Sequence, residues 1–233
     1  MTGSTVETLA SRHREVAARL LPKVELVIGG ERRAIGGGGV YEHVNPSTGL
    51  VQAEVPMASG KDVDEAVAAA RRALPGWRNT KPTQRRDILA KFADLIRDYE
   101  HWAPISVIEN GMPMVWASTF AGYAYDWTSY YASWADKLTG EVSIADSDEL
   151  VYTMSEPYGV IASIITWNAP LLSLVMKLPA ALAAGNTIVL KPAEFTPFTP
   201  MIFVELARAA GIPDGVINVV PGGNEAGEAL VRH

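Results

Sequence analysis

The sequence contains no cysteine among its 233 residues. That absence excludes disulfide bonds, thiolate metal sites and a cysteine nucleophile within the chain. Long apolar runs are missing as well: no stretch approaches the ~20 residues that span a bilayer, and the N-terminal residues carry scattered charges instead of the apolar core of a signal peptide. We therefore expect a cytoplasmic protein with no membrane partner.

Positive charge is also scarce. Lys and Arg total 20 while Asp and Glu total 26, which gives a formal net charge of -6. No basic stripe interleaves with aromatic residues, and binding to a phosphate backbone needs such a stripe, so we expect no nucleic-acid partner. Metal-ligand spacing is absent too, and we expect no metal site and a surface location for the four dispersed histidines, His13, His43, His101 and His233.

What is present is an ordinary globular composition, 48% hydrophobic and 20% charged. Apolar residues recur at helical spacing through the first 138 residues, and Ser59 followed by Asp62 forms a capping box that marks a helix start. A small β region precedes that start, with two extended pieces separated by a flexible glycine run at 36–39. The expected helices cover 5–21, 63–74, 83–99 and 113–137, and the extended pieces cover 24–28 and 51–55.

The expected helix at 113–137 is dense in aromatic side chains. Such density can line an apolar ligand tunnel, whereas packing in a core explains most aromatic residues in most helices. Both interpretations stay open from the sequence.

Two short alternating strands at 141–144 and 150–154 flank the turn residues Asp146, Ser147 and Asp148, which is the pattern of a β-hairpin. A two-stranded ribbon is barely stable alone in water. We therefore expect a projecting arm that rests on a partner surface, either elsewhere in the chain or on a second subunit.

From residue 157 the strands are apolar almost throughout and alternate with helices, which is typical of parallel strands buried on both faces. Gly185 and Gly211 end the first two helices. The predicted fold class is α/β, with three crossovers that form half of a doubly wound, Rossmann-like parallel sheet. The expected strands cover 159–166, 187–190 and 216–220, and the expected helices cover 170–184, 200–210 and 225–232.

Ligands of such sheets bind outside the carboxyl ends of the strands, so the three loops that follow the strands hold the candidate site. The first loop, at 166–168, presents the Asn168 amide. The second offers the Lys191 ammonium and the Glu194 carboxylate, a pair suited to ribose hydroxyls. The third is a glycine loop around Gly223 that leads into a helix N-terminus, where backbone N–H groups favour an anionic pyrophosphate. Together the loops predict a dinucleotide.

Each loop also has a plain structural interpretation. Lys191 and Glu194 are equally compatible with a solvated surface pair, Asn168 with a helix N-cap, and the glycines with ordinary turns. No GxGxxG fingerprint is present to decide between the two interpretations. The joint occurrence of the loops after three successive strands favours the binding site.

The sequence resembles the NAD(P)-dependent aldehyde dehydrogenase superfamily over nearly the whole chain after residue 23. Six motifs carry the resemblance, in family order. They are Asn45-Pro46-Ser47-Thr48-Gly49, Glu109-Asn110-Gly111 with Pro113, Glu156-Pro157-Tyr158-Gly159-Val160, Thr166-Trp167-Asn168-Ala169-Pro170, Lys191-Pro192-Ala193-Glu194, and Gly215-Val216-Ile217-Asn218-Val219-Val220-Pro221-Gly222.

By that resemblance Asn168 is a catalytic residue, the oxyanion-hole amide that donates to the aldehyde oxygen as it becomes negative. The implied cofactor is NAD in preference to NADP, because the Glu194 carboxylate accepts from both ribose hydroxyls and repels a 2′-phosphate. The residues implied to bind this cofactor are Ile164, Ile165, Thr166, Trp167, Asn168, Lys191, Glu194, Gly223 and Gly227.

The resemblance also implies how the chain is organised. The hairpin resembles the family's oligomerisation arm, which implies a homo-oligomer, either a dimer or a tetramer. In the family the cysteine nucleophile and the glutamate base lie downstream, in a catalytic domain that this chain is expected to lack. The implied segments are an N-terminal helical extension at 1–22, the N-terminal part of the cofactor-binding domain at 23–138, the hairpin at 139–156 and an incomplete NAD-binding segment at 157–233.

The implied activity of the complete enzyme is the oxidation of an aldehyde to a carboxylic acid through a thiohemiacetal, hydride transfer to NAD and thioester hydrolysis. The chain alone is expected to be inactive. Two alternatives stay open: a stand-alone truncated module that binds a dinucleotide or another subunit without catalysis, and a missing half that a separate polypeptide supplies.

Overall fold

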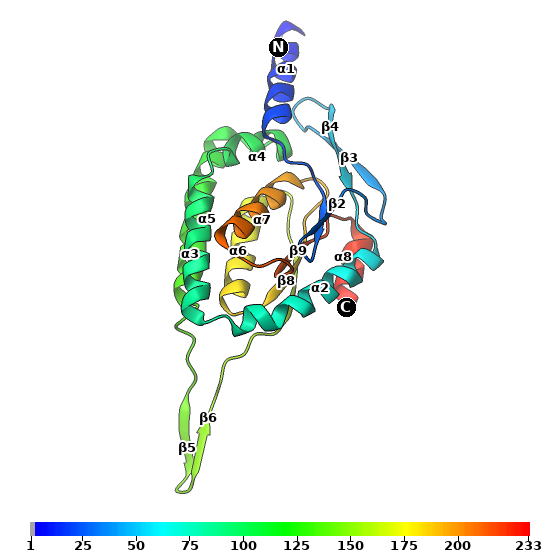
Figure 1. Ribbon diagram of the computed structural model, residues 1–233. Coiled ribbons are helices and arrows are strands. Elements are labelled where there is room, and N and C mark those ends of the chain that lie inside the picture. The colour runs from blue at the N-terminus through cyan, green and yellow to red at the C-terminus, as the bar shows by residue number, and fades with distance from the viewer. Residues whose placement is uncertain (1–2) are drawn as a thin grey trace.

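The computed structural model describes residues 3–233. Its centre is a five-stranded sheet with the strand order β2-β1-β9-β8-β7, and helices lie on both faces of this sheet (Figure 1). The strands of the central sheet are β1 (Leu26–Ile28), β2 (Glu31–Arg33), β7 (Val160–Ile164), β8 (Thr187–Lys191) and β9 (Ile217–Val219).

Three strands of this sheet are parallel, as predicted. β7 pairs with β8 and β8 pairs with β9, and every residue of β8 and β9 is buried. The crossovers are α6 (Pro170–Ala183), which leads from β7 to β8, and α7 (Phe198–Ala210), which leads from β8 to β9. The α/β, Rossmann-like class is therefore confirmed. The third helix, α8 (Asn224–Arg232), leads to no further strand in residues 3–233, so the described chain has two crossovers and not three.

The expectation of a separate small β region is wrong for its first piece. β1 joins the central sheet antiparallel to β9, with Val27 opposite Val219. Asn218 reinforces this junction, because its buried side chain accepts from the Gly29 N–H at 2.8 Å and donates to the Gly215 carbonyl at 2.7 Å. The second piece forms its own two-stranded sheet from β3 (Val40–Val44) and β4 (Val51–Pro56).

The apolar core divides between the two faces of the sheet. On one face α6 and α7 pack with α3 (Pro82–Asp98) and α5 (Met114–Trp134), around side chains such as Leu174 and Phe203. On the other face α2 (Gly60–Asn79) and α8 enclose a smaller cluster that contains Val63 and Leu230. The sequence did not predict α4 (Trp102–Asn110), a helix that precedes α5.

The capping box at the start of α2 is confirmed. The Ser59 hydroxyl accepts from the Asp62 N–H, and the Asp62 carboxylate accepts from the Ser59 N–H at 2.8 Å. The same carboxylate accepts from the Gly37 N–H at 2.9 Å. The glycine run at 36–39 is therefore not a free linker: a Cβ on Gly36 would lie 2.2 Å from the Met57 carbonyl oxygen, so the close packing of two backbones requires glycine there.

Most aromatic residues of α5 are exposed, whereas Phe120 packs against the core. The side of α5 that faces the protein carries small residues, among them Ala117, Ala124 and Ala132. Packing in the core therefore does not explain most of the aromatic residues of this helix. The exposed residues include Trp116 at 62%, Tyr123 at 58%, Tyr130 at 55% and Trp134 at 44%.

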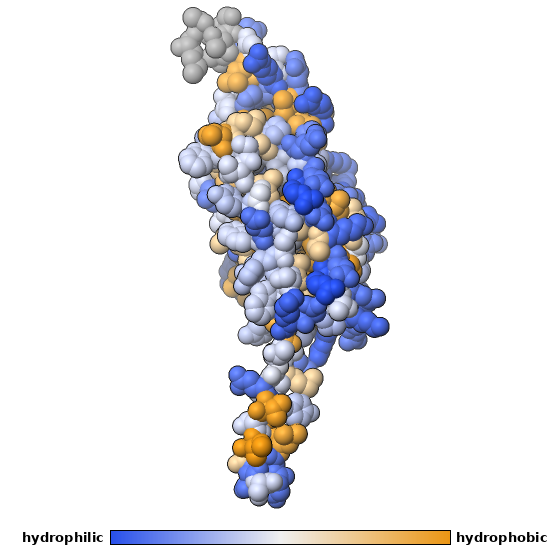
Figure 2. All heavy atoms as spheres, turned by 90° about the vertical axis from the view of Figure 1, so that its left-hand side faces the viewer, coloured by the Kyte–Doolittle hydropathy of each residue, from blue (hydrophilic) through white to orange (hydrophobic). Residues whose placement is uncertain are grey.

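Two elements project from this body. The hairpin of β5 (Val142–Asp146) and β6 (Glu149–Tyr152) extends away from it, as predicted, with all of its strand residues exposed and apolar side chains along its length (Figures 1 and 2). At the opposite end lies α1 (Gly3–Leu20), which contacts α4. Within residues 3–233 no helix combines the length and the apolar character needed to cross a lipid bilayer.

Candidate functional site

A groove lies between the carboxyl ends of β7 and β8 and the start of α8. The groove has a volume of about 540 Å³ and runs along one side of α8. Ile164 and Lys191 line it from the two strands, and Gly223 and Gly227 line it from the start of α8. These four residues, all assigned to the cofactor site from the sequence, therefore lie around one space.

Lys191 brings a buried positive charge to the groove. Its side chain is 7% exposed, and its ammonium donates to the Pro192 carbonyl at 3.3 Å. No carboxylate of residues 3–233 lies within ion-pair distance of it. Burial lowers the pKa of Lys191, and the charge of Glu194 opposes this shift. The interpretation as a solvated surface pair is thus wrong, and the ammonium has unused donors.

Glycines keep the space beside these charges open. A Cβ on Gly227 would lie 3.5 Å from Cε of Lys191, and a Cβ on Gly223 would lie 4.0 Å from Oε1 of Glu194. Gly223 is also the N-cap of α8, whose first N–H groups form a positive end. A buried ammonium, a carboxylate and a helix N-terminus together fit a polyol with an adjacent anion, as in the ribose and pyrophosphate of a dinucleotide.

The first loop is held mainly by α6 and β8. The Ile165 N–H donates to the Lys191 carbonyl at 3.1 Å, and the Ile165 side chain is buried in the core, away from the groove. The hydroxyls of Thr166 and Ser173 lie 2.6 Å apart, and Lys177 donates to the Ile164 carbonyl at 2.5 Å. Ile165 and Thr166 therefore support the loop in this structure, and neither lines the groove.

Asn168 is exposed, and its side-chain amide makes no hydrogen bond to any residue of the described chain. It is not the N-cap of α6, because that position belongs to Ala169 and carries no side-chain cap. The N-cap interpretation is therefore wrong. The backbone is held instead: Asn110 Nδ2 donates to the Trp167 carbonyl at 3.1 Å and to the Asn168 carbonyl at 3.0 Å. The amide is left free to donate to a ligand.

Trp167 lies in a second hollow, of about 280 Å³, and is 59% exposed. His43 forms part of its wall and is only 1% exposed, so the prediction of a surface position for this histidine is wrong. Its Nε2 lies 2.9 Å from the Phe195 carbonyl, and Gln52 Nε2 lies 3.1 Å from its Nδ1. Burial lowers the pKa of His43, which favours a neutral ring that donates to Phe195 and accepts from Gln52.

A carboxylate anchors the loop that carries Glu194. Glu109 is 1% exposed and accepts from the Phe198 N–H at 2.6 Å, from the Thr199 N–H at 3.0 Å and from the Thr199 hydroxyl. These donors form the N-terminus of α7. Burial raises the pKa of Glu109 to about 7, although the hydrogen bonds from Thr199 and Phe198 act in the opposite direction.

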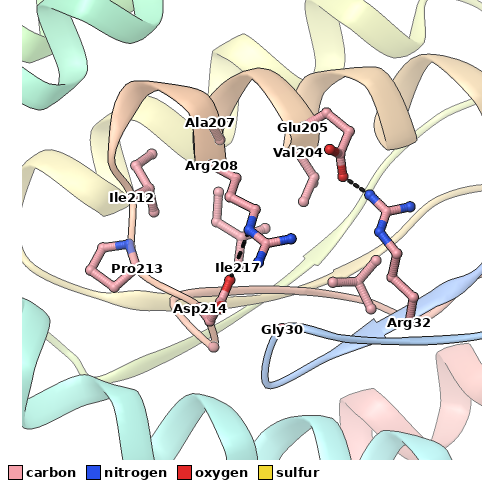
Figure 3. A pocket seen from close by; sticks show the side chains of 12 residues that line it. Gly30, Arg32, Val204, Glu205, Ala207, Arg208, Ile212, Pro213, Asp214 and Ile217 are labelled. Carbon is pink, nitrogen blue, oxygen red and sulfur yellow. Dashed lines mark ion pairs between the residues drawn. The ribbon is translucent and has the colours of Figure 1, made fainter.

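A small cavity beneath the β1–β2 turn is of a different kind (Figure 3). Its volume is about 30 Å³, which is room for little more than one water. An ion pair joins Arg32 to Glu205 across it, and another joins Arg208 to Asp214 at 3.3 Å. These contacts attach the β1–β2 hairpin and the loop before β9 to α7. The cavity is therefore a small gap where these elements pack together.

Sequence reasoning assigned no role to the residues that hold the first loop. Ser173 and Lys177 lie on α6, and Asn110 lies in a motif that served only to identify a resemblance. The Glu109-Asn110-Gly111 motif was the available signal for Asn110, but only the fold shows that this residue reaches a loop 58 positions further along the chain.

The family model described as "Aldehyde dehydrogenase family" matches residues 36–233. An aldehyde dehydrogenase of Emericella nidulans is 43% identical over 199 residues, which cover 84% of this chain and 40% of that protein. The putative aldehyde dehydrogenase DhaS of Bacillus subtilis is 40% identical over 216 residues, which cover 90% of this chain and 43% of that protein.

Solved structures agree with this assignment. The aldehyde dehydrogenase of Bacillus cereus, solved as an NAD+ complex, superposes with a TM-score of 0.87 at 39% identity, over 94% of this chain and 46% of that one. The chain thus spans less than half the length of these relatives. From the match over residues 36–233 and these identities, we conclude that the chain belongs to the aldehyde dehydrogenase family.

Proposed function

We propose that this chain forms the cofactor-binding part, and supplies the oxyanion donor, of an NAD-dependent enzyme that oxidises an aldehyde to a carboxylic acid. One observation carries the proposal: the ends of β7 and β8 and the start of α8 line a single groove that combines a buried ammonium and a helix N-terminus, with the Glu194 carboxylate close by. Membership of the aldehyde dehydrogenase family supports the same reaction.

The groove residues have separate tasks in this proposal. Lys191 donates to a ribose hydroxyl and Glu194 accepts from one, so that a bound nucleotide uses donors of the Lys191 ammonium beyond the one given to the Pro192 carbonyl. The N–H groups after Gly223 face the pyrophosphate, and Gly227 leaves space beside Lys191. Ile164 forms an apolar wall. When bound, NAD accepts the hydride from the substrate.

Asn168 acts on the aldehyde in this proposal. Its free amide donates to the aldehyde oxygen, which gains negative charge when a thiolate attacks the carbonyl carbon. The thiolate comes from outside these 233 residues, because they contain no cysteine. Of the other residues implied to bind the cofactor, Trp167 lines the second hollow and not the groove, while Ile165 and Thr166 act by holding the loop in place.

We also propose the organisation of the complete protein. Residues 1–22 form an N-terminal extension, residues 23–138 and 157–233 contribute to the cofactor-binding domain, and residues 139–156 form an arm that joins subunits into a dimer or tetramer. The exposed apolar side chains of the arm support the last role. The proposed location is the cytoplasm, which cell fractionation tests.

The substitution Asn168→Ala in the active enzyme tests the proposal. We expect kcat to fall by roughly 100-fold to 1,000-fold, because one oxyanion donor is lost, while the dissociation constant of NAD, measured by calorimetry, stays nearly unchanged. Asn79→Ala is the matched control, since Asn79 is exposed at the end of α2. Equal losses in turnover and NAD binding would contradict the role of Asn168.

A further inference from the structure

The C-terminal end of α4 contacts the loop that carries Asn168. Asn110, the last residue of α4, places its side chain against this loop, and Nδ2 donates to the carbonyl oxygens of Trp167 and Asn168, at 3.1 Å and 3.0 Å. Its Oδ1 accepts from the Met112 N–H at 3.1 Å. Both ends of the Asn110 amide are therefore engaged, and its orientation is fixed because carbonyl oxygens only accept hydrogen bonds.

These two hydrogen bonds act on the backbone on either side of one Cα atom. The Trp167 carbonyl belongs to the peptide plane before the Asn168 Cα, and the Asn168 carbonyl belongs to the plane after it. Because peptide units are planar, holding both carbonyls restrains both backbone dihedral angles of Asn168. These dihedrals set the direction in which the Asn168 side chain leaves the backbone, and that side chain has no other restraint among the described residues.

The end of α4 is itself firmly placed. The neighbouring residue, Glu109, is buried and accepts from the first N–H groups of α7. Gly111 ends α4 in the left-handed conformation, with φ of 75°, and a Cβ there would lie 3.2 Å from Cγ of Pro46. The Asn110 side chain therefore projects from a packed and anchored helix end, which allows it to hold an exposed loop.

From this geometry we infer that Asn110 is a positioning residue for the Asn168 amide. It orients the oxyanion donor through two hydrogen bonds to the flanking carbonyls and does not itself touch the substrate. The inference rests on the proposed role of Asn168. It adds that two hydrogen bonds from Asn110 hold that amide in place before the substrate binds.

A double-mutant cycle between Asn110 and Asn168 in the active enzyme tests the inference, with propanal as the probe aldehyde. Asn110→Asp keeps the shape of the side chain and the acceptor for Met112, but it turns the donor into an oxygen that repels both carbonyls. We expect kcat to fall by about 10-fold to 100-fold, the loss typical of a small misplacement of a catalytic group. The NAD dissociation constant should change less than about two-fold, since Lys191 and Glu194 are untouched.

The second arm of the cycle separates positioning from a general structural effect. In an Asn168→Ala background, Asn110→Asp should change kcat by less than about two-fold, because no oxyanion amide remains to be positioned. The same fold-loss in both backgrounds would overturn the inference, and so would an unchanged kcat in the single variant. If Asn168→Ala alone leaves kcat unchanged, the oxyanion role fails, and the inference fails with it.

Two further variants control for misfolding. Asn110→Ala removes the donor without adding charge and takes the place of Asn110→Asp in the cycle if the aspartate variant does not fold. Asn79→Asp makes the same chemical change at an exposed site and should leave kcat and NAD affinity unchanged. A parallel fall of kcat in this control would overturn the interpretation of the Asn110 variants.

Discussion

At the scale of single residues, Glu194 and Lys191 place opposite charges beside the same groove, yet they form no ion pair. Each side chain is thus available to a ligand, and the negative charge has a selective effect. A carboxylate near the ribose site repels a 2′-phosphate, whereas it accepts a hydrogen bond from a 2′-hydroxyl. Discrimination between NAD and NADP should therefore depend on the charge of Glu194.

Glu194→Gln tests this dependence. The variant removes the charge and keeps an acceptor oxygen, so we expect the ratio of kcat/KM for NADP to kcat/KM for NAD to rise about ten-fold, which corresponds to ~1.4 kcal/mol. Steady-state rates with both cofactors measure the ratio. Glu100→Gln, at an exposed position outside the groove, is the control. Equal or better use of NADP by the unmodified enzyme would argue against the proposed preference for NAD.

Glu109 links pH to stability. Its pKa rises from 4.5 to about 7 on folding, so between these values the folded state keeps a proton that the unfolded state releases. The contribution of Glu109 to the free energy of unfolding is therefore fully present below pH 4.5. As the pH rises towards 7, the free energy of unfolding falls by about 3 kcal/mol.

Glu109→Gln should remove this dependence, because glutamine does not titrate and still offers an oxygen to the N–H groups of α7. Urea unfolding between pH 4.5 and 8 should show the wild type losing about 3 kcal/mol relative to the variant. The exposed substitution Glu100→Gln should leave the wild-type profile unchanged. Parallel profiles for the wild type and Glu109→Gln would contradict the raised pKa.

At the scale of elements, the β5–β6 arm exposes more apolar surface than a free ribbon tolerates. Ile144 is 77% exposed, Val142 is 72% exposed and Leu150 is 69% exposed, and the two strands make contact with each other rather than with the body. Burial of these side chains against another subunit would stabilise both the arm and the assembly.

Ile144→Lys should weaken that assembly. A charge at the centre of the arm opposes its burial in an interface, so we expect sedimentation velocity to show a shift towards smaller species, with little change in the melting temperature of the subunit body. Ile35→Lys makes the same change at a position that is 84% exposed outside the arm. If both variants sediment alike, the arm is not the interface.

At the scale of the whole molecule, the sequence predicts the parallel core well and its edges poorly. Strands β8 and β9 are evident because burial on both faces makes them largely apolar, and β7 has a similar composition although it lies at the edge of the sheet and is only partly buried. β1 has only three residues and meets β9 at one register position, so its place depends on contacts with distant residues. α4 begins without a side-chain cap and has Pro104 in its first turn, which leaves no strong start signal.

The candidate site is also only partly predictable from the sequence. The loops that form it follow from the strand pattern, and Lys191, Gly223 and Gly227 do meet around one groove. The burial of Lys191 and the hydrogen bond from Asn110 to the loop that carries Asn168 cannot be predicted from the sequence, because local patterns carry no information on which distant elements pack together. For the same reason, the density of aromatic residues in α5 did not reveal that most of them face outward.

The pairing of β1 with β9 has a consequence during synthesis. Gly29 donates to Asn218, a partner 189 residues later, and β1 can pair with β2 at once but gains its link to the parallel strands only when β9 exists. At translation rates of about 5–20 residues per second, that wait lasts roughly 10–40 s. Throughout this time an apolar Leu-Val-Ile segment is on the nascent chain without its place in the core. The first strand to leave the ribosome therefore completes its pairing only after β9 has been made.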